Sequence, residues 1–150
     1  MEAVHGTTHS FLVPFLVLGF FYAISFCISF MSGWFALSQR FTKESEPIGQ
    51  TRTAGPFFYK VYTRFWTRYS SAVRLTSSED ALFVSVFFLF RLCHPPLQIP
   101  WKEVKLARTK YLWRRYIVLT LGELEQIPFR IPERMARNLG ILDRLPKETA

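Results

Sequence analysis

The sequence contains one long apolar stretch, FLVPFLVLGFFYAISFCISFMSGWFAL, which runs from Phe11 to Leu37 and has no Asp, Glu, Lys or Arg among its twenty-seven residues. An α-helix rises about 1.5 Å per residue and the hydrocarbon core of a bilayer is about 30 Å thick, so about 20 apolar residues suffice to cross it. The stretch 11–37 is therefore predicted to be a membrane-spanning helix, with its excess length taken up by tilt or by an interfacial end. Trp34 and the first basic residue, Arg40, are expected to mark the second interface.

The distribution of charge predicts the orientation of this span. Residues 1–39 contain one charged residue, Glu2, whereas residues 40–150 contain all nineteen Lys and Arg against ten Asp and Glu. Segments rich in Lys and Arg beside a span are retained in the cytoplasm. We therefore expect a single-pass protein of the inner (cytoplasmic) membrane, with the leader, residues 1–10, outside and the C-terminal domain in the cytoplasm.

A cleavable signal peptide is the alternative interpretation of the N-terminal stretch. Such peptides have a basic n-region followed by an apolar region of about 7–15 residues. Here no Lys or Arg precedes the apolar run, the run is about twice that length, and its end at Met31–Phe35 leads into further apolar residues. A retained span is the favoured reading.

Small residues interrupt the bulky side chains of the span. Gly19 and Ala23 have the small-xxx-small spacing that lets two helices approach closely, and so do Ser25 and Ser29. These four residues are predicted to dock on another membrane helix. The alternative is a plain lipid-facing anchor.

Residues 38–56 are polar and contain two Pro and two Gly, which is typical of a linker. Residues 57–145 are predicted to form one small domain, and residues 146–150 a tail. Within the domain, runs rich in β-branched and aromatic residues indicate strands. These runs are 57–66, 72–76, 81–92, 104–106 and 111–121.

Two patterns in the domain indicate how it is layered. Phe83–Phe90 is apolar on both faces, so this strand is expected to be covered on both sides, by the membrane surface or by a C-terminal helix. That helix is predicted to begin at Ile131-Pro132-Glu133 and to stop at Gly140. Its apolar stripe consists of Ile131, Met135, Leu139 and Leu142. Antiparallel strands followed by one amphipathic helix predict an α+β fold, in which the helix closes a small antiparallel sheet or a partly open barrel.

The sequence Ala81-Leu-Phe-Val-Ser-Val-Phe-Phe-Leu-Phe-Arg91, followed by His94-Pro-Pro-Leu-Gln-Ile-Pro-Trp101-Lys-Glu-Val104, resembles a known pattern. It is similar to a family of uncharacterised bacterial single-span membrane proteins with an FR-x-x-HPPL-x-IPW signature. Residues 99–104 also resemble a step in bacterial pleckstrin-homology-like and GRAM-like domains, which are bent β-sheets capped by a C-terminal helix. The resemblance implies this fold and a membrane tether, but no established activity. Its structural motif positions are Arg91, His94, Pro95, Pro96 and Trp101.

His94 is one of these motif positions that could in principle carry chemistry. The other histidines, His5 and His9, are predicted to lie across the membrane, so His94 has no companion for a metal site. A hydrogen bond that caps the turn before Pro95-Pro96 is the favoured role.

The segment Lys102–Arg115, called here the basic segment, has one acid, Glu103, with Tyr111 and Trp113 interleaved among its bases. It is predicted to contact anionic lipid headgroups or an acidic partner. The alternative is a solvated strand edge whose charge discourages edge-to-edge pairing. Nucleic-acid binding is disfavoured because no RNP, zinc-finger or helix-turn-helix spacing is present. The bases are Lys102, Lys105, Arg108, Lys110, Arg114 and Arg115.

No P-loop, dinucleotide-binding, nucleophile-elbow or HExxH pattern is present. We therefore predict no catalytic, cofactor-binding or metal-ligating residue and no cofactor. The expected function is that of a non-enzymatic accessory subunit, which docks on a larger respiratory or photosynthetic membrane complex through its span and its cytoplasmic domain. The alternative is an independent module that binds anionic lipid or senses envelope stress.

Overall fold

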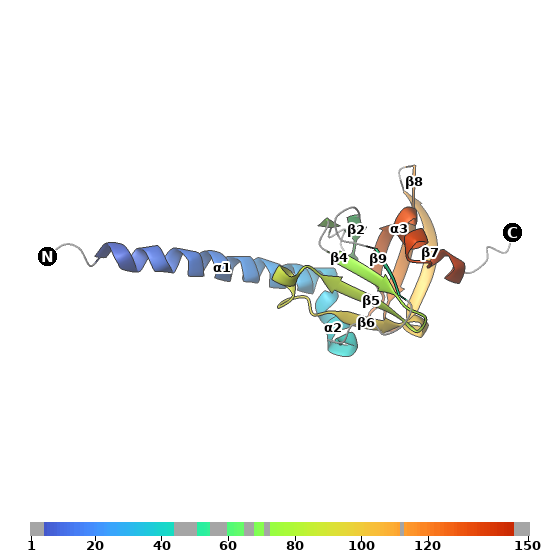
Figure 1. Ribbon diagram of the computed structural model, residues 1–150, viewed down its shortest axis with the longest axis horizontal. Coiled ribbons are helices and arrows are strands. Elements are labelled where there is room, and N and C mark those ends of the chain that lie inside the picture. The colour runs from blue at the N-terminus through green and yellow to red at the C-terminus, as the bar shows by residue number, and fades with distance from the viewer. Residues whose placement is uncertain are drawn as a thin grey trace.

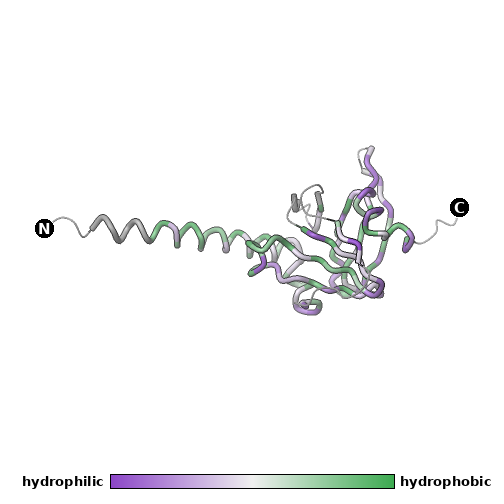
Figure 2. The backbone as a smooth tube through the Cα atoms, viewed as in Figure 1, coloured by the Kyte–Doolittle hydropathy of each residue, from purple (hydrophilic) through white to green (hydrophobic). Residues whose placement is uncertain are grey.

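A computed structural model describes residues 5–43, 51–54, 60–64, 68–70, 73–111 and 113–145. The first part of the predicted leader, the middle of the predicted linker and the predicted tail at 146–150 lie outside these residues. Figure 1 shows a long helix, α1 (His5–Ser32), that projects from one end of a small domain. Within the described residues, one helical stretch, Leu12–Ser32, is long and apolar enough to cross a membrane, and Figure 2 shows its apolar character.

The domain contains two antiparallel sheets. The first has the strand order β1-β4-β5-β6, and the second has the order β3-β2-β9-β8-β7. The strands of the first sheet are β1 (Arg52–Ala54), β4 (Val73–Ser77), β5 (Ala81–Val86) and β6 (Leu97–Pro100). Those of the second are β2 (Lys60–Tyr62), β3 (Arg68–Ser70), β7 (Val104–Tyr111), β8 (Arg114–Leu121) and β9 (Ile127–Pro132). The α+β prediction is confirmed, but the two small sheets do not close into a barrel, and the pleckstrin-homology-like fold remains a prediction.

Two short helices complete the domain. α2 (Trp34–Phe41) follows α1 after one residue and packs on β6, and α3 (Glu133–Asn138) packs on β1, β8 and β9. The predicted C-terminal helix is shorter than expected, because Ile131 and Pro132 belong to β9 and Leu142 to a separate 3₁₀ turn. The predicted burial holds, since Ile131, Met135 and Leu139 are buried and Leu142 packs against the core. Gly140 follows α3 with φ of 67°, a left-handed conformation that suits glycine and ends a helix.

Both sheets and α2 contribute to one hydrophobic core. Alternation along β8 and β9 buries every second residue against it, as expected of strands with one wet face. Apolar burial of this kind is the main favourable contribution to folding. Its largest fully buried side chains include Trp34, Leu37, Leu75, Leu97, Ile117, Leu119 and Phe129.

The structure corrects the predicted ends of the span and the linker. α1 ends at Ser32, and residues 34–37 belong to α2. Trp34 is fully buried, so it is not an interfacial marker. Residues 38–41 complete α2 and residues 52–54 form β1, so these parts of the predicted linker have regular structure.

One predicted strand was too long, and the strands β6 and β9 were not predicted. The run 81–92 was expected to be one covered strand, but β5 ends at Val86, and Phe88–Phe90 forms a single 3₁₀ turn. Strand β9 was missed because Pro128 and Pro132 disfavour a strand. Pro128 is tolerated because β2 pairs with β9 only through Tyr62 and Arg130, so that β9 has one described neighbour at Pro128.

Candidate functional site

The junction between α1 and the domain is built on Gly33. Its φ of 82° lies in the left-handed region, and this lets the chain turn from α1 into α2. A Cβ on Gly33 would lie 2.5 Å from Cδ1 of Ile127 in β9, so a side chain does not fit there. Glycine therefore allows both the turn and the close approach of the junction to the second sheet.

Trp34 anchors this junction in the hydrophobic core, where its side chain is fully buried. The indole Nε1 donates a hydrogen bond of 2.9 Å to the carbonyl oxygen of Pro95. The same ring packs edge-on against His94, with centroids 5.3 Å apart, and lies 6.1 Å from the ring of Phe129. The helix and the domain are thus one packed unit at this point.

The motif residues 94–97 form the receiving surface for α2. The backbone N–H of Lys43 donates to the carbonyl of Pro96 at 3.1 Å, and Thr42 makes a β-bridge with Leu97. His94 is buried, and burial lowers the pKa of its imidazole, an effect that a hydrogen bond to the backbone of Phe90 opposes. His94 therefore serves the junction through the edge-on packing of its ring against Trp34.

The other motif positions lie away from the junction. Trp101 is partly buried at the edge of the core, and its Nε1 donates to the carbonyl of Ser78 at 2.9 Å. The guanidinium of Arg144 lies 4.5 Å from its ring centroid, in a cation–π arrangement. Arg91 is exposed.

The four predicted helix-docking residues fall on two different surfaces. Ser25 and Ser29 are buried against the domain, and Ser29 Oγ donates a 2.6 Å hydrogen bond to the carbonyl of Cys93. The segment around Cys93, from the same chain, therefore covers this pair. Ala23 is exposed, and a Cβ at Gly19 would meet nothing within 4 Å. Only Gly19 and Ala23 remain open to a partner helix.

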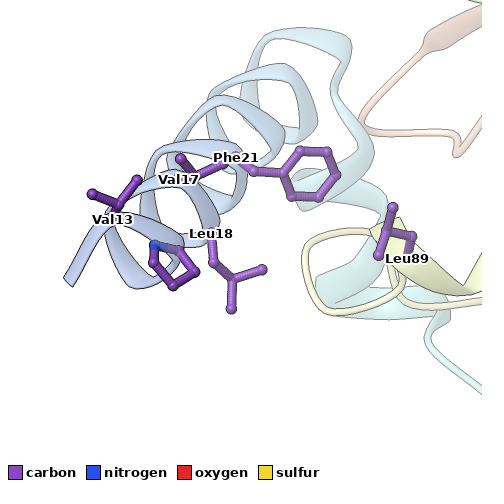
Figure 3. A pocket seen from close by; sticks show the side chains of 6 residues that line it. Val13, Val17, Leu18, Phe21 and Leu89 are labelled. Atoms are coloured by element: carbon purple, nitrogen blue, oxygen red, sulfur yellow. The ribbon is translucent and has the colours of Figure 1, made fainter. Parts of the chain in front are cut away.

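Beside α1 lies an exposed apolar segment, Phe87–Leu92, which we call the apolar loop. Its exposed apolar side chains are Phe87, Phe88, Leu89 and Leu92. Leu89 and α1 enclose a groove of about 600 Å³, and Figure 3 shows the ring of Phe21 directed toward Leu89. Sequence reasoning placed Phe87–Phe90 in a covered strand and so missed this surface. The signal was the apolar character of both faces, which also suits a loop in contact with lipid.

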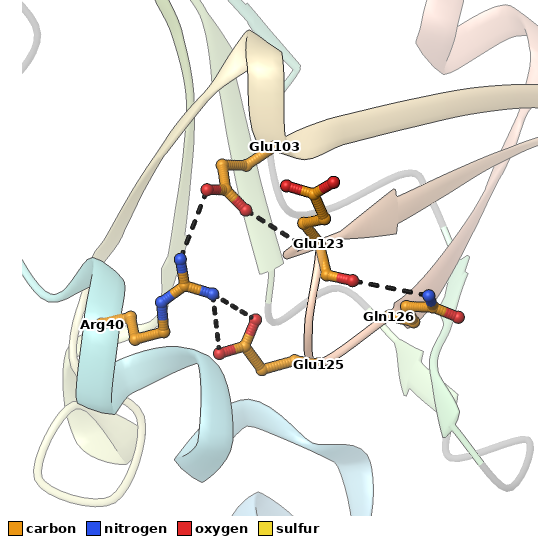
Figure 4. Close-up of polar contacts among 5 residues, drawn as sticks. All are labelled: Arg40, Glu103, Glu123, Glu125 and Gln126. Carbon is orange, nitrogen blue, oxygen red and sulfur yellow. Dashed lines mark hydrogen bonds and ion pairs between the residues drawn. The ribbon is translucent and has the colours of Figure 1, made fainter.

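Arg40, near the end of α2, connects three parts of the chain (Figure 4). Its guanidinium forms ion pairs with Glu103 at 3.3 Å and with Glu125 at 3.0 Å. Glu103 also accepts a 2.8 Å hydrogen bond from the backbone N–H of Glu123. The hydrogen bond to Glu125 raises the pKa of Arg40 above its ordinary value. Arg40, predicted as an interfacial residue, thus holds α2 to the segments before β7 and after β8.

The basic segment lies on β7, β8 and the 3₁₀ turn before them, at the end of the domain remote from α1 (Figure 1). All six predicted contact residues are exposed, and Trp113 beside them is 92% exposed. Arg108, Lys110 and Arg115 come together around a shallow pocket of about 410 Å³ that Glu133 also lines. The six residues are Lys102, Lys105, Arg108, Lys110, Arg114 and Arg115.

Within the described ranges, no group of three or more His, Cys, Asp and Glu residues is placed to hold a metal ion. The chain was compared with protein-family models, with curated proteins and with solved structures, and it matches none of them.

Proposed function

We propose that this protein is a membrane-anchored accessory subunit, which holds its domain at a fixed position on a larger integral membrane complex. The observation that carries this proposal is the packed junction at Gly33 and Trp34, since the chain enters the hydrophobic core at Trp34, one residue after α1 ends. Its action would be positional: the span sets where the domain lies, and the domain presents its surface to neighbouring subunits. A respiratory or photosynthetic complex is the proposed host.

The same junction favours a retained anchor over a cleavable signal peptide. Removal of α1 with its C-terminal end would take away Ser29, which bonds to Cys93, and would leave the buried α2 without its preceding helix. In addition, only 11% of the most apolar part of α1 is buried by the rest of the chain, whereas the core helix of a water-soluble protein is mostly buried. The proposed orientation, with the domain in the cytoplasm, rests on the distribution of Lys and Arg.

The exposed face of α1 at Gly19 is the proposed docking surface for another helix. A side chain at Gly19 would meet nothing in this chain, so Gly19→Leu blocks the close approach of a partner helix without disturbing the protein's own packing. Phe20→Leu, at the adjacent exposed position, is the matched control.

The test is purification of the tagged full chain in a mild detergent, at native expression level, followed by identification of bound membrane proteins. We expect integral membrane proteins to co-purify with the wild type and with Phe20→Leu, and to be lost with Gly19→Leu. Recovery of the wild type only as a free monomer would contradict the proposal.

A second candidate function, recognition of anionic lipid, depends on the basic segment. The bases around the pocket at Arg108, Lys110 and Arg115 favour an anionic ligand, but their distance from α1 in Figure 1 favours an acidic protein surface over the bilayer to which α1 belongs. Full-length protein in vesicles with and without anionic lipid separates the two. Salt-sensitive protection of the basic segment only in anionic vesicles would favour lipid recognition.

A further inference from the structure

The apolar loop touches α1 near the middle of its apolar part. The ring of Phe90 lies 5.4 Å from that of Phe21, and the Sγ of Cys93 donates a long hydrogen bond of 3.7 Å to the carbonyl of Tyr22. Leu89 faces the same turn of the helix across the groove (Figure 3). The loop is therefore fixed along the axis of α1 at the level of residues 21 and 22.

This level is too close to the start of the apolar stretch to lie outside a membrane that α1 crosses. From Leu12 to Phe21 the helix rises about 14 Å, less than half of the 30 Å or so of hydrocarbon. If the span began at His5, the helix up to Phe21 would be about 10 Å longer, which is still less than the thickness of the hydrocarbon. Such a span would also place His5, His9 and their polar neighbours in the hydrocarbon. The span must therefore include the turns of α1 that lie beside the apolar loop.

From these distances we propose that the apolar loop is a second membrane-embedded element, which enters the leaflet on the domain side and packs beside α1. Its partner is the acyl chains of that leaflet, which contact the exposed Phe87, Phe88 and Leu92 and fill the groove at Leu89. The proposal rests on the proposed role of α1 as a membrane anchor. It adds a second point of insertion, which fixes both the depth of the domain and its rotation about α1.

The composition of the surrounding sequence fits this position. Between Ala81 and Trp101, Arg91 is the single Asp, Glu, Lys or Arg. Arg91 is exposed, and a long arginine side chain can keep its stem in hydrocarbon while its guanidinium reaches the lipid phosphates. Part of the loop's backbone is paired within the chain. The N–H groups of Phe90 and Arg91 donate within the 3₁₀ turn, and those of Cys93 and His94, just after the loop, donate to the carbonyl of Phe90, which lowers the cost of placing this irregular backbone in a membrane.

The test places one nitroxide label at a time on the full chain, in lipid vesicles, in a Cys27→Ala, Cys93→Ala background. Leu92→Cys reports on the apolar loop, and Phe88→Cys is a second reporter in case one label disturbs the turn. Leu124→Cys is the matched control, because Leu124 is an equally exposed leucine (81% against 78% for Leu92), in the turn between β8 and β9. Val17→Cys reports on α1 itself.

The measurement is the collision rate of each label with a water-soluble nickel chelate and with oxygen. We expect the rate with the chelate at Leu92 and Phe88 to be about tenfold lower than at Leu124 and similar to that at Val17, because a polar complex is excluded from hydrocarbon. Water-like rates at both loop positions, with Val17 protected, would overturn the proposal and leave the anchor intact. Water-like rates at Val17 as well would overturn the anchor and the proposal together.

Discussion

The apolar loop and the basic segment are both exposed parts of the same small domain, yet their side chains have opposite chemistry. The apolar loop presents Phe and Leu beside α1, whereas β8 begins with the exposed Arg114 and Arg115. Figure 2 shows that the β7–β8 hairpin is hydrophilic and lies on the side of the domain away from α1. A water-soluble domain rarely keeps large apolar side chains exposed in one cluster unless something covers them. The contrast gives the domain a membrane end and an aqueous end, joined through the core around Trp34.

The largest effect is expected where the membrane end joins the core. Trp34→Ala removes a fully buried ring and should lower the free energy of unfolding by about 3–5 kcal/mol. Urea unfolding of the full chain in mild detergent, followed by near-UV circular dichroism, measures this loss. Trp34→Phe is the control: it keeps most of the packing, loses the hydrogen bond to Pro95, and should cost about 1–2 kcal/mol. Equal stability of all three proteins would mean that helix and domain are not coupled through Trp34.

Gly33→Ala tests the turn at the same junction. An alanine there must adopt a left-handed conformation and displace Ile127, so we expect a loss of about 1–3 kcal/mol in the free energy of unfolding. Gly140→Ala is the matched control, since its φ is also positive but the atoms nearest to its Cβ would belong to the long, flexible side chain of Arg52. Unfolding curves for the two variants should differ, with Gly33→Ala the less stable.

The sequence predicts those parts of the molecule whose structure depends on a local pattern of residues. The absence of charge in residues 11–37 predicts a membrane helix without any tertiary information, and the spacing of Ile131, Met135 and Leu139 predicts that all three are buried, although Ile131 lies in β9 and not in α3. Trp34, Leu37 and Phe41 could not be assigned in this way, because an apolar side chain looks the same in sequence whether lipid or a protein core covers it. The left-handed turn at Gly33 separates the two environments, and one glycine in an apolar run is a weak signal.

Long-range pairing explains the remaining misses. The division into two sheets depends on which strands become neighbours, and β2 pairs with β9 although the partners Tyr62 and Arg130 are 68 positions apart in the sequence. Phe87–Leu92 was assigned to a strand because two-faced apolar character is shared by covered strands and by loops in lipid. Among the candidate site residues, spacing predicted Ser25 and Ser29 as a docking pair, but the segment that covers them is distant in sequence and was invisible to a local reading.

Lowering the pH should weaken the junction through His94, with a smaller effect than Trp34→Ala. Burial lowers the pKa of His94 in the folded state below its ordinary value near 6.5, so the unfolded chain binds the proton more readily. Stability is then complete above the unfolded pKa and falls as the pH drops below about 6.5 toward the lowered folded value. Urea midpoints measured from pH 7.5 to 5.5 should decline for the wild type. His94→Gln should have a flatter profile over this window, and parallel profiles would show that His94 does not contribute.

The smallest effect on stability is expected at the aqueous end. Arg114→Ala with Arg115→Ala should change the free energy of unfolding by less than about 0.5 kcal/mol, because both residues are exposed and lie outside the core. Because the double substitution is expected to leave the fold intact, a loss of binding can be attributed to the basic segment itself. The isolated fragment 50–150 is unsuitable for this purpose, since it lacks Trp34, Leu37 and Phe41 from the core, so the full chain must be used.

If the basic segment contacts an acidic partner, the double variant should stay in the membrane fraction with wild-type stability and should lose part of its co-purified proteins. Restoring positive charge with Arg114→Lys and Arg115→Lys should recover much of that binding, because lysine keeps the charge although not the planar geometry of arginine. If the double alanine variant keeps every partner, we would conclude that the positive charge only solvates the edge of the hairpin. The aqueous end of the molecule would then serve solubility, and specific recognition would be confined to the membrane end.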